Sequence, residues 1–169
     1  MATILSCIDS RVPTELVFDL GIGNVFSVHV AGNVIGTKSL ASIEYGVVVA
    51  DVKLALVLGH THCGAVPSSL LVFSDNKTVE QETGSRHLQK IVDEIAPSVE
   101  RAEFADFKSF GAGEQKSFVD EVAKRNVLRT VDEIVARSAA ISQAVNEGKV
   151  LVVGAICDVK SGDIEFLEK

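Results

Sequence analysis

Short apolar runs alternate with helical stretches along the chain, and this alternation constrains the fold more than any other feature. The runs that read as buried strands are Thr3 to Ser6, Asn24 to Ala31, Leu54 to Leu58 and Val150 to Ile156. The stretches between them carry apolar residues at helical spacing, as in Lys38 to Asp51. Strands that alternate with helices predict βαβ crossovers, and therefore a mostly parallel α/β sheet with helices on both faces.

The remaining elements follow from the same patterns. A strand order of 2-1-3-4 is expected, followed by a short antiparallel return strand over Ile164 to Leu167 after the Ser161-Gly162 turn. Polar residues and glycine favour an irregular connection over Phe104 to Gly113. Further helices are expected over Pro13 to Leu20, Ala65 to Phe73, Arg86 to Val99 and Lys116 to Asn146. The length of 169 residues fits a single domain over residues 1–169.

Composition excludes several classes of function. The net charge is -7 and no block of Lys or Arg is present, which argues against a nucleic-acid groove. No apolar run approaches the roughly 20 residues of a membrane helix, and no signal peptide is expected. Three cysteines are an odd number, which disfavours a disulfide scaffold and favours metal or catalytic use in a reducing, cytoplasmic setting.

Two motifs follow the first and third apolar runs. They are Cys7-Ile8-Asp9-Ser10-Arg11 and His60-Thr61-His62-Cys63. In the predicted order the two strands are neighbours at the point where the strand order reverses, which is where ligands bind in open parallel sheets. Two sulfurs and one nitrogen form the ligand set of a zinc site with one position open. Asp9 could close that position as the fourth ligand of a structural zinc site, or Asp9 and Arg11 could be an ordinary ion pair.

These motifs resemble the signature of the β-class carbonic anhydrases. Cys7-x-Asp9-Ser10-Arg11 combined with His60-x-x-Cys63-Gly64 carries the resemblance. The similarity covers nearly the whole chain and extends through Phe26, Ala31 to Asn33, Ile43-Glu44-Tyr45, Gly59 and Val153-Gly154. The resemblance implies that the chain folds as one β-carbonic anhydrase-like domain.

The resemblance also implies a mechanism. Cys7, His60 and Cys63 would hold Zn²⁺, and Asp9 and Arg11 would form a dyad beside it. In a closed state Asp9 would bind the metal, and in an open state it would pair with Arg11. The implied reaction is the reversible hydration of CO2 to bicarbonate and a proton by metal-bound hydroxide.

The same resemblance suggests a substrate pocket and an assembly. Phe26, Val30, Ala31, Tyr45 and Gly64 are the positions expected to line the pocket, with Tyr45 reaching the cleft of a neighbouring subunit. A homodimer or a higher homo-oligomer is expected, with a small-molecule substrate and with neither nucleic acid nor membrane as a partner.

Two other functions remain open on the same motifs. One is the hydrolysis of carbonyl sulfide or carbon disulfide, which are linear molecules like CO2. The other is a non-catalytic relative that binds zinc or bicarbonate.

Some positions depart from the family pattern. The chain starts six residues before Cys7, so the N-terminal helical arm of many members is expected to be missing. Ile4, His29 and Cys157 replace the tryptophan, arginine and tyrosine of the bicarbonate-inhibited subset, so that inhibitory site is expected to be absent. The charged residues of Glu114 to Arg137 read as a solvated helix surface, and His62 reads as a surface or proton-shuttle residue.

Overall fold

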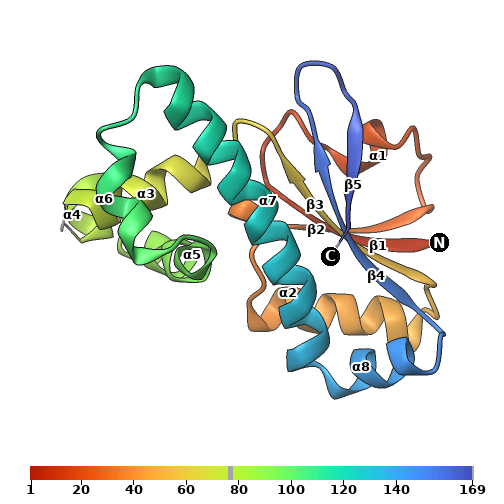
Figure 1. Cartoon of the computed structure of the whole chain (residues 1–169). Helices are drawn as coiled ribbons and strands as arrows, with labels where there is room; N and C mark the ends of the chain where they lie inside the picture. The colour runs from red at the N-terminus through yellow and green to blue at the C-terminus, as the bar shows by residue number, and fades with distance from the viewer. Residues whose placement is uncertain (76–77, 169) are drawn as a thin grey trace.

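The computed structural model describes residues 1–75 and 78–168, within which five strands form one sheet of order β2-β1-β3-β4-β5 (Figure 1). The first four strands are mutually parallel, and β5 runs antiparallel to β4. The predicted strand order and the antiparallel return strand are therefore confirmed. The strands are β1 Ala2–Ser6, β2 Val25–His29, β3 Leu54–His60, β4 Leu151–Cys157 and β5 Ile164–Leu167.

The register of β1 and β3 brings the two motifs to one edge of the sheet. Ser6, the last residue of β1, pairs with Leu58, and β3 continues from there to His60. Residues Ala55 to His60 are all buried, as is usual for the central strands of a parallel sheet. A nearly continuous apolar run therefore ends directly at the polar residues of each motif.

Helices surround the sheet on both faces and beyond one end. Figure 1 shows α7 lying across the sheet, with α3, α4, α5 and α6 gathered to one side of it. No helix in the described part of the chain is long and apolar enough to cross a membrane. The helices are α1 Thr14–Val17, α2 Thr37–Glu44, α3 Ala65–Asp75, α4 Val79–Thr83, α5 Gln89–Ile95, α6 Arg101–Phe107, α7 Ala112–Arg137 and α8 Ala139–Asn146.

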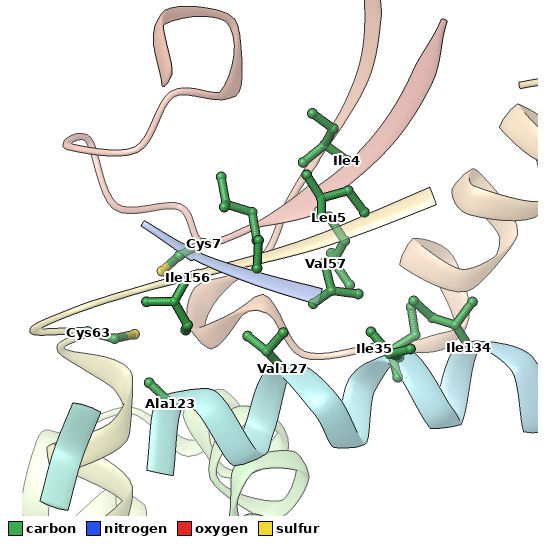
Figure 2. Packing of buried hydrophobic residues seen from close by; sticks show 14 of the residues in the cluster. Ile4, Leu5, Cys7, Ile35, Val57, Cys63, Ala123, Val127, Ile134 and Ile156 are labelled. Carbon is green, nitrogen blue, oxygen red and sulfur yellow. The ribbon is translucent and has the colours of Figure 1, made fainter. Parts of the chain in front are cut away.

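Close contact between α7 and the sheet depends on two glycines. A Cβ atom added at Gly59 of β3 would lie 2.5 Å from Val127 Cγ2, and one added at Gly154 of β4 would lie 2.6 Å from Val127 Cγ1. Figure 2 shows Val127 and Ala123 on the face of α7 that points to the buried core. The absence of side chains at the two glycines lets the helix approach the strands that end at the motifs.

Two predicted helices and one predicted connection need correction. The helix expected over Lys116 to Asn146 is two helices, because the Ser138 hydroxyl accepts a hydrogen bond from the Ile141 N–H (3.1 Å) and begins α8. The irregular connection expected over Phe104 to Gly113 is also wrong, since α6 continues to Phe107 and α7 begins at Ala112. The helix expected over Pro13 to Leu20 is shorter, as α1 spans only Thr14–Val17.

Side-chain capping explains why the predicted connection is largely helical. The Glu103 carboxylate accepts a hydrogen bond from the Glu100 N–H (2.8 Å) at the start of α6. The Glu114 carboxylate accepts one from the Gly111 N–H (2.8 Å) at the start of α7. Each of these contacts satisfies a backbone donor at a helix start, so it can help to begin a helix in a polar segment.

Candidate metal centre

Three buried side chains converge where β1 and β3 end. Cys7 directly follows β1, His60 is the last residue of β3, and Cys63 lies in the turn before α3. The two sulfur atoms and a ring nitrogen of His60 all lie within 4.8 Å of one another. Figure 2 shows both cysteine side chains at the margin of the apolar core. The predicted convergence of these residues is therefore present in the fold.

The orientation of His60 supports a role as a ligand. Its Nδ1 lies 3.0 Å from the carbonyl oxygen of Thr61, which can only accept, so we assign the proton to Nδ1. The lone pair is then on Nε2, which is buried and has no hydrogen-bond partner among the residues that the structure describes. A backbone carbonyl commonly fixes the tautomer of a metal-binding histidine in this way. The unsatisfied Nε2 therefore fits a metal ion.

The two thiols interact strongly with each other. The hydrogen bond that Cys63 donates lowers the pKa of Cys7, against the effect of burial, and the Gly32 N–H (3.4 Å) contributes to the same shift. The same pairing, together with burial, raises the pKa of Cys63. Burial lowers the pKa of His60, but its contacts with Cys7, the Thr61 carbonyl and Asp9 outweigh burial and raise it. Two adjacent buried sulfurs can both ionise only beside a cation, which fits a thiolate-binding metal.

Asp9 lies next to this group and is held by Arg11. Arg11 Nε donates to Asp9 Oδ1 (2.9 Å), Arg11 Nη2 donates to Oδ2 (2.7 Å), and the Arg11 backbone N–H donates to Oδ1 (3.0 Å). These bonds hold the pKa of Asp9 well below its usual range. Asp9 Oδ2 also lies 3.9 Å from His60 Nε2, so the pair borders the candidate metal ligands.

The turn between His60 and Cys63 is bound on several sides. His62 has a left-handed backbone (φ 58°), which is uncommon for a residue other than glycine. Its N–H donates to Asp120 Oδ1 (2.7 Å), and its carbonyl accepts from Arg11 Nη2 (3.1 Å). The Thr61 N–H donates to the Cys157 carbonyl (3.0 Å) at the end of β4. These contacts fix the turn relative to α7, the first motif and the sheet.

Asp120 is the residue at this site that the sequence did not reveal. Its segment read as a solvated helix surface, and for Asp120 that interpretation is wrong, because its carboxylate binds the turn. The ring of His62 also faces Asp120, with Nδ1 3.4 Å from Oδ2, so it points away from Cys7 and Cys63 as expected. No local motif marks Asp120, since its partner is 58 residues away.

A mostly apolar cavity of about 260 Å³ opens beside Cys7 and Asp9. Ala31 and Gly64, two of the predicted pocket residues, line it. Its far wall consists of apolar side chains from α3, α4 and α5, including Val72, Val79, Ile91 and Val92. The site therefore combines polar groups at one end with an apolar space at the other.

The other predicted pocket residues lie outside this cavity in the single chain. Phe26 and Tyr45 pack edge to face with ring centroids 6.2 Å apart, and they line a separate hollow that includes His29. Val30 lines a third hollow, together with residues of α2 and α5. Of the five predicted positions, the structure brings two to the cavity beside Asp9.

At two of the positions that depart from the family pattern, the side chain lies in an ordinary protein environment. His29 Nδ1 lies 2.9 Å from Ser6 Oγ and 3.1 Å from the Cys7 carbonyl oxygen. Cys157 is buried at the end of β4, and burial raises its pKa, as expected for an inert core thiol. The predicted absence of an inhibitory bicarbonate site stays a prediction.

Comparisons with known proteins agree on one family. The family model described as carbonic anhydrase matches residues 2–164. Carbonic anhydrase 2 of Mycobacterium tuberculosis is 38% identical over 161 residues, which cover 95% of this chain and 71% of that protein. The carbonic anhydrase of Mycolicibacterium smegmatis is 37% identical over 165 residues, covering 98% of this chain and 73% of that protein. The crystal structure of the β-carbonic anhydrase CafA of Aspergillus fumigatus superposes with a TM-score of 0.81 at 26% identity, covering 99% of this chain and 74% of the other.

Proposed function

The chain belongs to the β-class carbonic anhydrases, and we propose that its Cys7, His60 and Cys63 hold the zinc ion with which it acts on CO2. It is a carbonate dehydratase, an enzyme that interconverts CO2 and water with bicarbonate and a proton. The relatives named above are carbonic anhydrases, which favours CO2 over carbonyl sulfide or carbon disulfide as the substrate.

One observation carries the zinc assignment. Two sulfurs and one imidazole nitrogen lie within 4.8 Å of one another in a buried site, and the nitrogen has no hydrogen-bond partner in the described part of the chain. At tetrahedral angles, zinc bonds of about 2.3 Å to sulfur and about 2.0 Å to nitrogen would place such atoms roughly 3.5–3.8 Å apart, which lies within this limit. Three protein ligands and one open position are the arrangement of catalytic zinc sites. When bound, zinc would supply a Lewis acid that activates water near neutral pH.

Asp9 would orient the reacting water. Because Arg11 keeps the pKa of Asp9 low, the carboxylate stays ionised at neutral pH and can only accept hydrogen bonds. Oδ2 faces the His60 side of the site at 3.9 Å, where it can accept a hydrogen bond from the water and direct a lone pair of that water towards the substrate carbon. Arg11 prevents the carboxylate from occupying the open position as a fourth ligand.

The cavity beside Asp9 would hold CO2. Ala31, Gly64 and the apolar side chains of α3 and α5 give it walls without strong hydrogen-bond donors, which suits an uncharged linear molecule. The charged Asp9 and Arg11 lie at its polar end, towards which bicarbonate would leave. Access to solvent at Arg11, which is about half exposed, would let the proton leave as well.

A homodimer is part of the proposal. Tyr45, Val48 and Val49 are apolar or aromatic side chains that are exposed together on one turn, which is unusual for the free surface of a single chain. Phe26 packs on Tyr45, so burial of this surface against a second subunit would also enclose Phe26. Light scattering coupled to size-exclusion chromatography would measure the mass, and a purely monomeric protein would contradict the dimer.

The proposed compartment is the cytoplasm. Cys7, Cys63 and Cys157 are all free thiols, as a reducing compartment and a thiolate metal site both require.

Stopped-flow measurement of proton release on mixing with CO2 tests the proposed function. The zinc-loaded protein should release protons far faster than buffer alone, and Cys7→Ser should abolish both the activity and tight zinc binding. A Cys7→Ser protein with unchanged hydration activity would overturn the assignment. A zinc-loaded wild type without activity would instead favour the non-catalytic alternative.

A further inference from the structure

We propose that Asp120 of α7 is a positioning residue that fixes both the metal-binding turn and the Asp9–Arg11 pair. Its consequence for catalysis rests on the proposed function, whereas its consequence for metal affinity requires only that the Cys7–His60–Cys63 group binds a metal. The inference starts from the contacts of one backbone unit, that of His62.

The backbone of His62 is bound from both sides. Its N–H donates to Asp120 Oδ1 at 2.7 Å, and its carbonyl accepts from Arg11 Nη2 at 3.1 Å. A short hydrogen bond to a carboxylate is among the stronger ones that a backbone N–H can make. Asp120 and the guanidinium that binds Asp9 therefore hold the two consecutive peptide groups that meet at the Cα of His62.

The backbone conformation of His62 explains why such a restraint is needed. Its φ of 58° is left-handed, and a non-glycine residue keeps this conformation only when the surrounding structure enforces it. His62 immediately precedes Cys63 and follows His60 by two residues, so relaxation of its φ would move the sulfur relative to the imidazole. The Asp120 side chain is the contact that binds the N–H of this strained residue.

The position of Asp120 follows from the packing of α7 on the sheet. Val127 fills the space above Gly59, one residue before His60, and thereby fixes the height of α7 along β3. Asp120 lies two helical turns before Val127 on the same side of the helix, about 10 Å along its axis. His62 lies three residues beyond Gly59, also about 10 Å at most for extended chain. The packing of α7 on β3 therefore places the Asp120 carboxylate beside the turn.

Zinc affinity of matched variants tests the proposal. Asp120→Leu keeps the size of the side chain without any acceptor, whereas Asp120→Asn keeps an acceptor oxygen. Glu121→Ala is the control, since Glu121 is exposed on the same helix and pairs only with Arg125 among the contacts described for it. We expect D120L to bind zinc about ten- to a hundredfold more weakly in competition with a chelator, D120N to remain close to the wild type, and E121A to be unchanged.

Two further readouts separate positioning from general stability. In the cobalt-substituted protein, D120L should shift the thiolate-to-metal absorption bands, whereas E121A should not. For CO2 hydration, D120L should lower kcat with little change in KM, because the displaced groups act on the reacting water rather than on the apolar walls.

Several results would overturn the proposal. One is a D120L protein with the zinc affinity and cobalt spectrum of E121A, and another is a D120N protein as impaired as D120L. The third is a D120L protein that does not fold, because the contact of Asp120 with His62 lies outside the core between α7 and the sheet. If the wild type bound zinc but did not hydrate CO2, the proposed function would fail while the affinity difference between D120L and D120N would still stand.

Discussion

Arg11 donates two side-chain hydrogen bonds to the Asp9 carboxylate. The same carboxylate lies 3.9 Å from His60 Nε2, which has no hydrogen-bond partner among the described residues. Asp9 thus has a guanidinium on one side and the candidate metal ligands on the other. The two partners compete for one carboxylate, so the balance between them decides whether the fourth metal position is open.

Arg11→Ala is the first test of this balance. The variant should still hold zinc when the metal is in excess, because Cys7, His60 and Cys63 remain, but Asp9 should lose its contacts with Arg11 and turn towards the metal. Hydrogen bonds to charged groups contribute about 1.5–3 kcal/mol, so kcat/KM should fall about ten- to a hundredfold. Stopped-flow kinetics and metal analysis on one sample measure both effects. The control is Lys124→Ala, which removes a surface cation paired with Glu165 (2.7 Å), and equal activity of R11A and K124A would contradict the account.

Gly59→Ala tests the contact between α7 and the strand that carries His60. The added Cβ would lie 2.5 Å from Val127 Cγ2 and 2.8 Å from Ile156 Cδ1, so the helix must move away from the strand. Overpacking of this kind costs about 1–3 kcal/mol of unfolding free energy, which urea denaturation would measure. Gly113→Ala is the matched control in α7, because its added Cβ would have no described atom within 4 Å apart from its chain neighbours and the backbone of its own helix. Equal stability of the two variants would rule out the close approach described here.

Ser138→Ala tests the break between α7 and α8. The buried Ser138 hydroxyl accepts from the Ile141 N–H (3.1 Å) and donates to Glu44 Oε1 (2.6 Å). Loss of an N-cap costs about 1 kcal/mol, and the uncompensated Glu44 should add to this. Thermal or chemical denaturation should show the loss for S138A but not for Ser117→Ala, whose exposed hydroxyl donates to the Gly113 carbonyl (3.2 Å). An S138A protein as stable as S117A would show that the cap contributes nothing.

The Glu103–Arg125 pair gives a prediction about pH. Burial raises the pKa of Glu103, but the Glu100 N–H and Arg125 outweigh it and lower the pKa below its ordinary value of 4.5. A lowered folded-state pKa means that the contribution to stability is present above 4.5 and is lost as the pH falls through the folded-state value. Both side chains are partly exposed, so Glu103→Gln should cost about 1 kcal/mol or less near neutral pH.

Unfolding of E103Q and the wild type across the acidic range would check that prediction. The difference in unfolding free energy should shrink steadily below pH 4.5. A difference that persists unchanged in acid would mean that the carboxylate charge is not its source.

The parts of the fold set by local patterns could be predicted from the sequence. Buried parallel strands read as continuous apolar runs, so β1, β3 and β4 and their order were predicted correctly. Helix ends were less predictable, because they depend on side chains that fold back onto the backbone, as Ser138 and Glu103 do. Apolar spacing alone does not record such capping contacts.

In the candidate site, too, some residues could be predicted from the sequence and others could not. Cys7, His60 and Cys63 belong to short motifs at strand ends, so the topology was enough to bring them together. Asp120 reaches the turn because α7 packs on the sheet, and nothing near Asp120 in the sequence indicates its hydrogen bond to the turn. Phe26 and Tyr45 contact each other as one unit but lie outside the cavity of this chain, so their role depends on the proposed second subunit.

An anomalous-scattering map recorded at the zinc edge on crystals of the purified protein tests the central claim most directly. The account predicts one strong peak bonded to the sulfurs of Cys7 and Cys63 and to Nε2 of His60, with Asp9 still on Arg11 and a fourth position left for water. A peak bound elsewhere, or no peak at this group in crystals of protein that hydrates CO2, would contradict it.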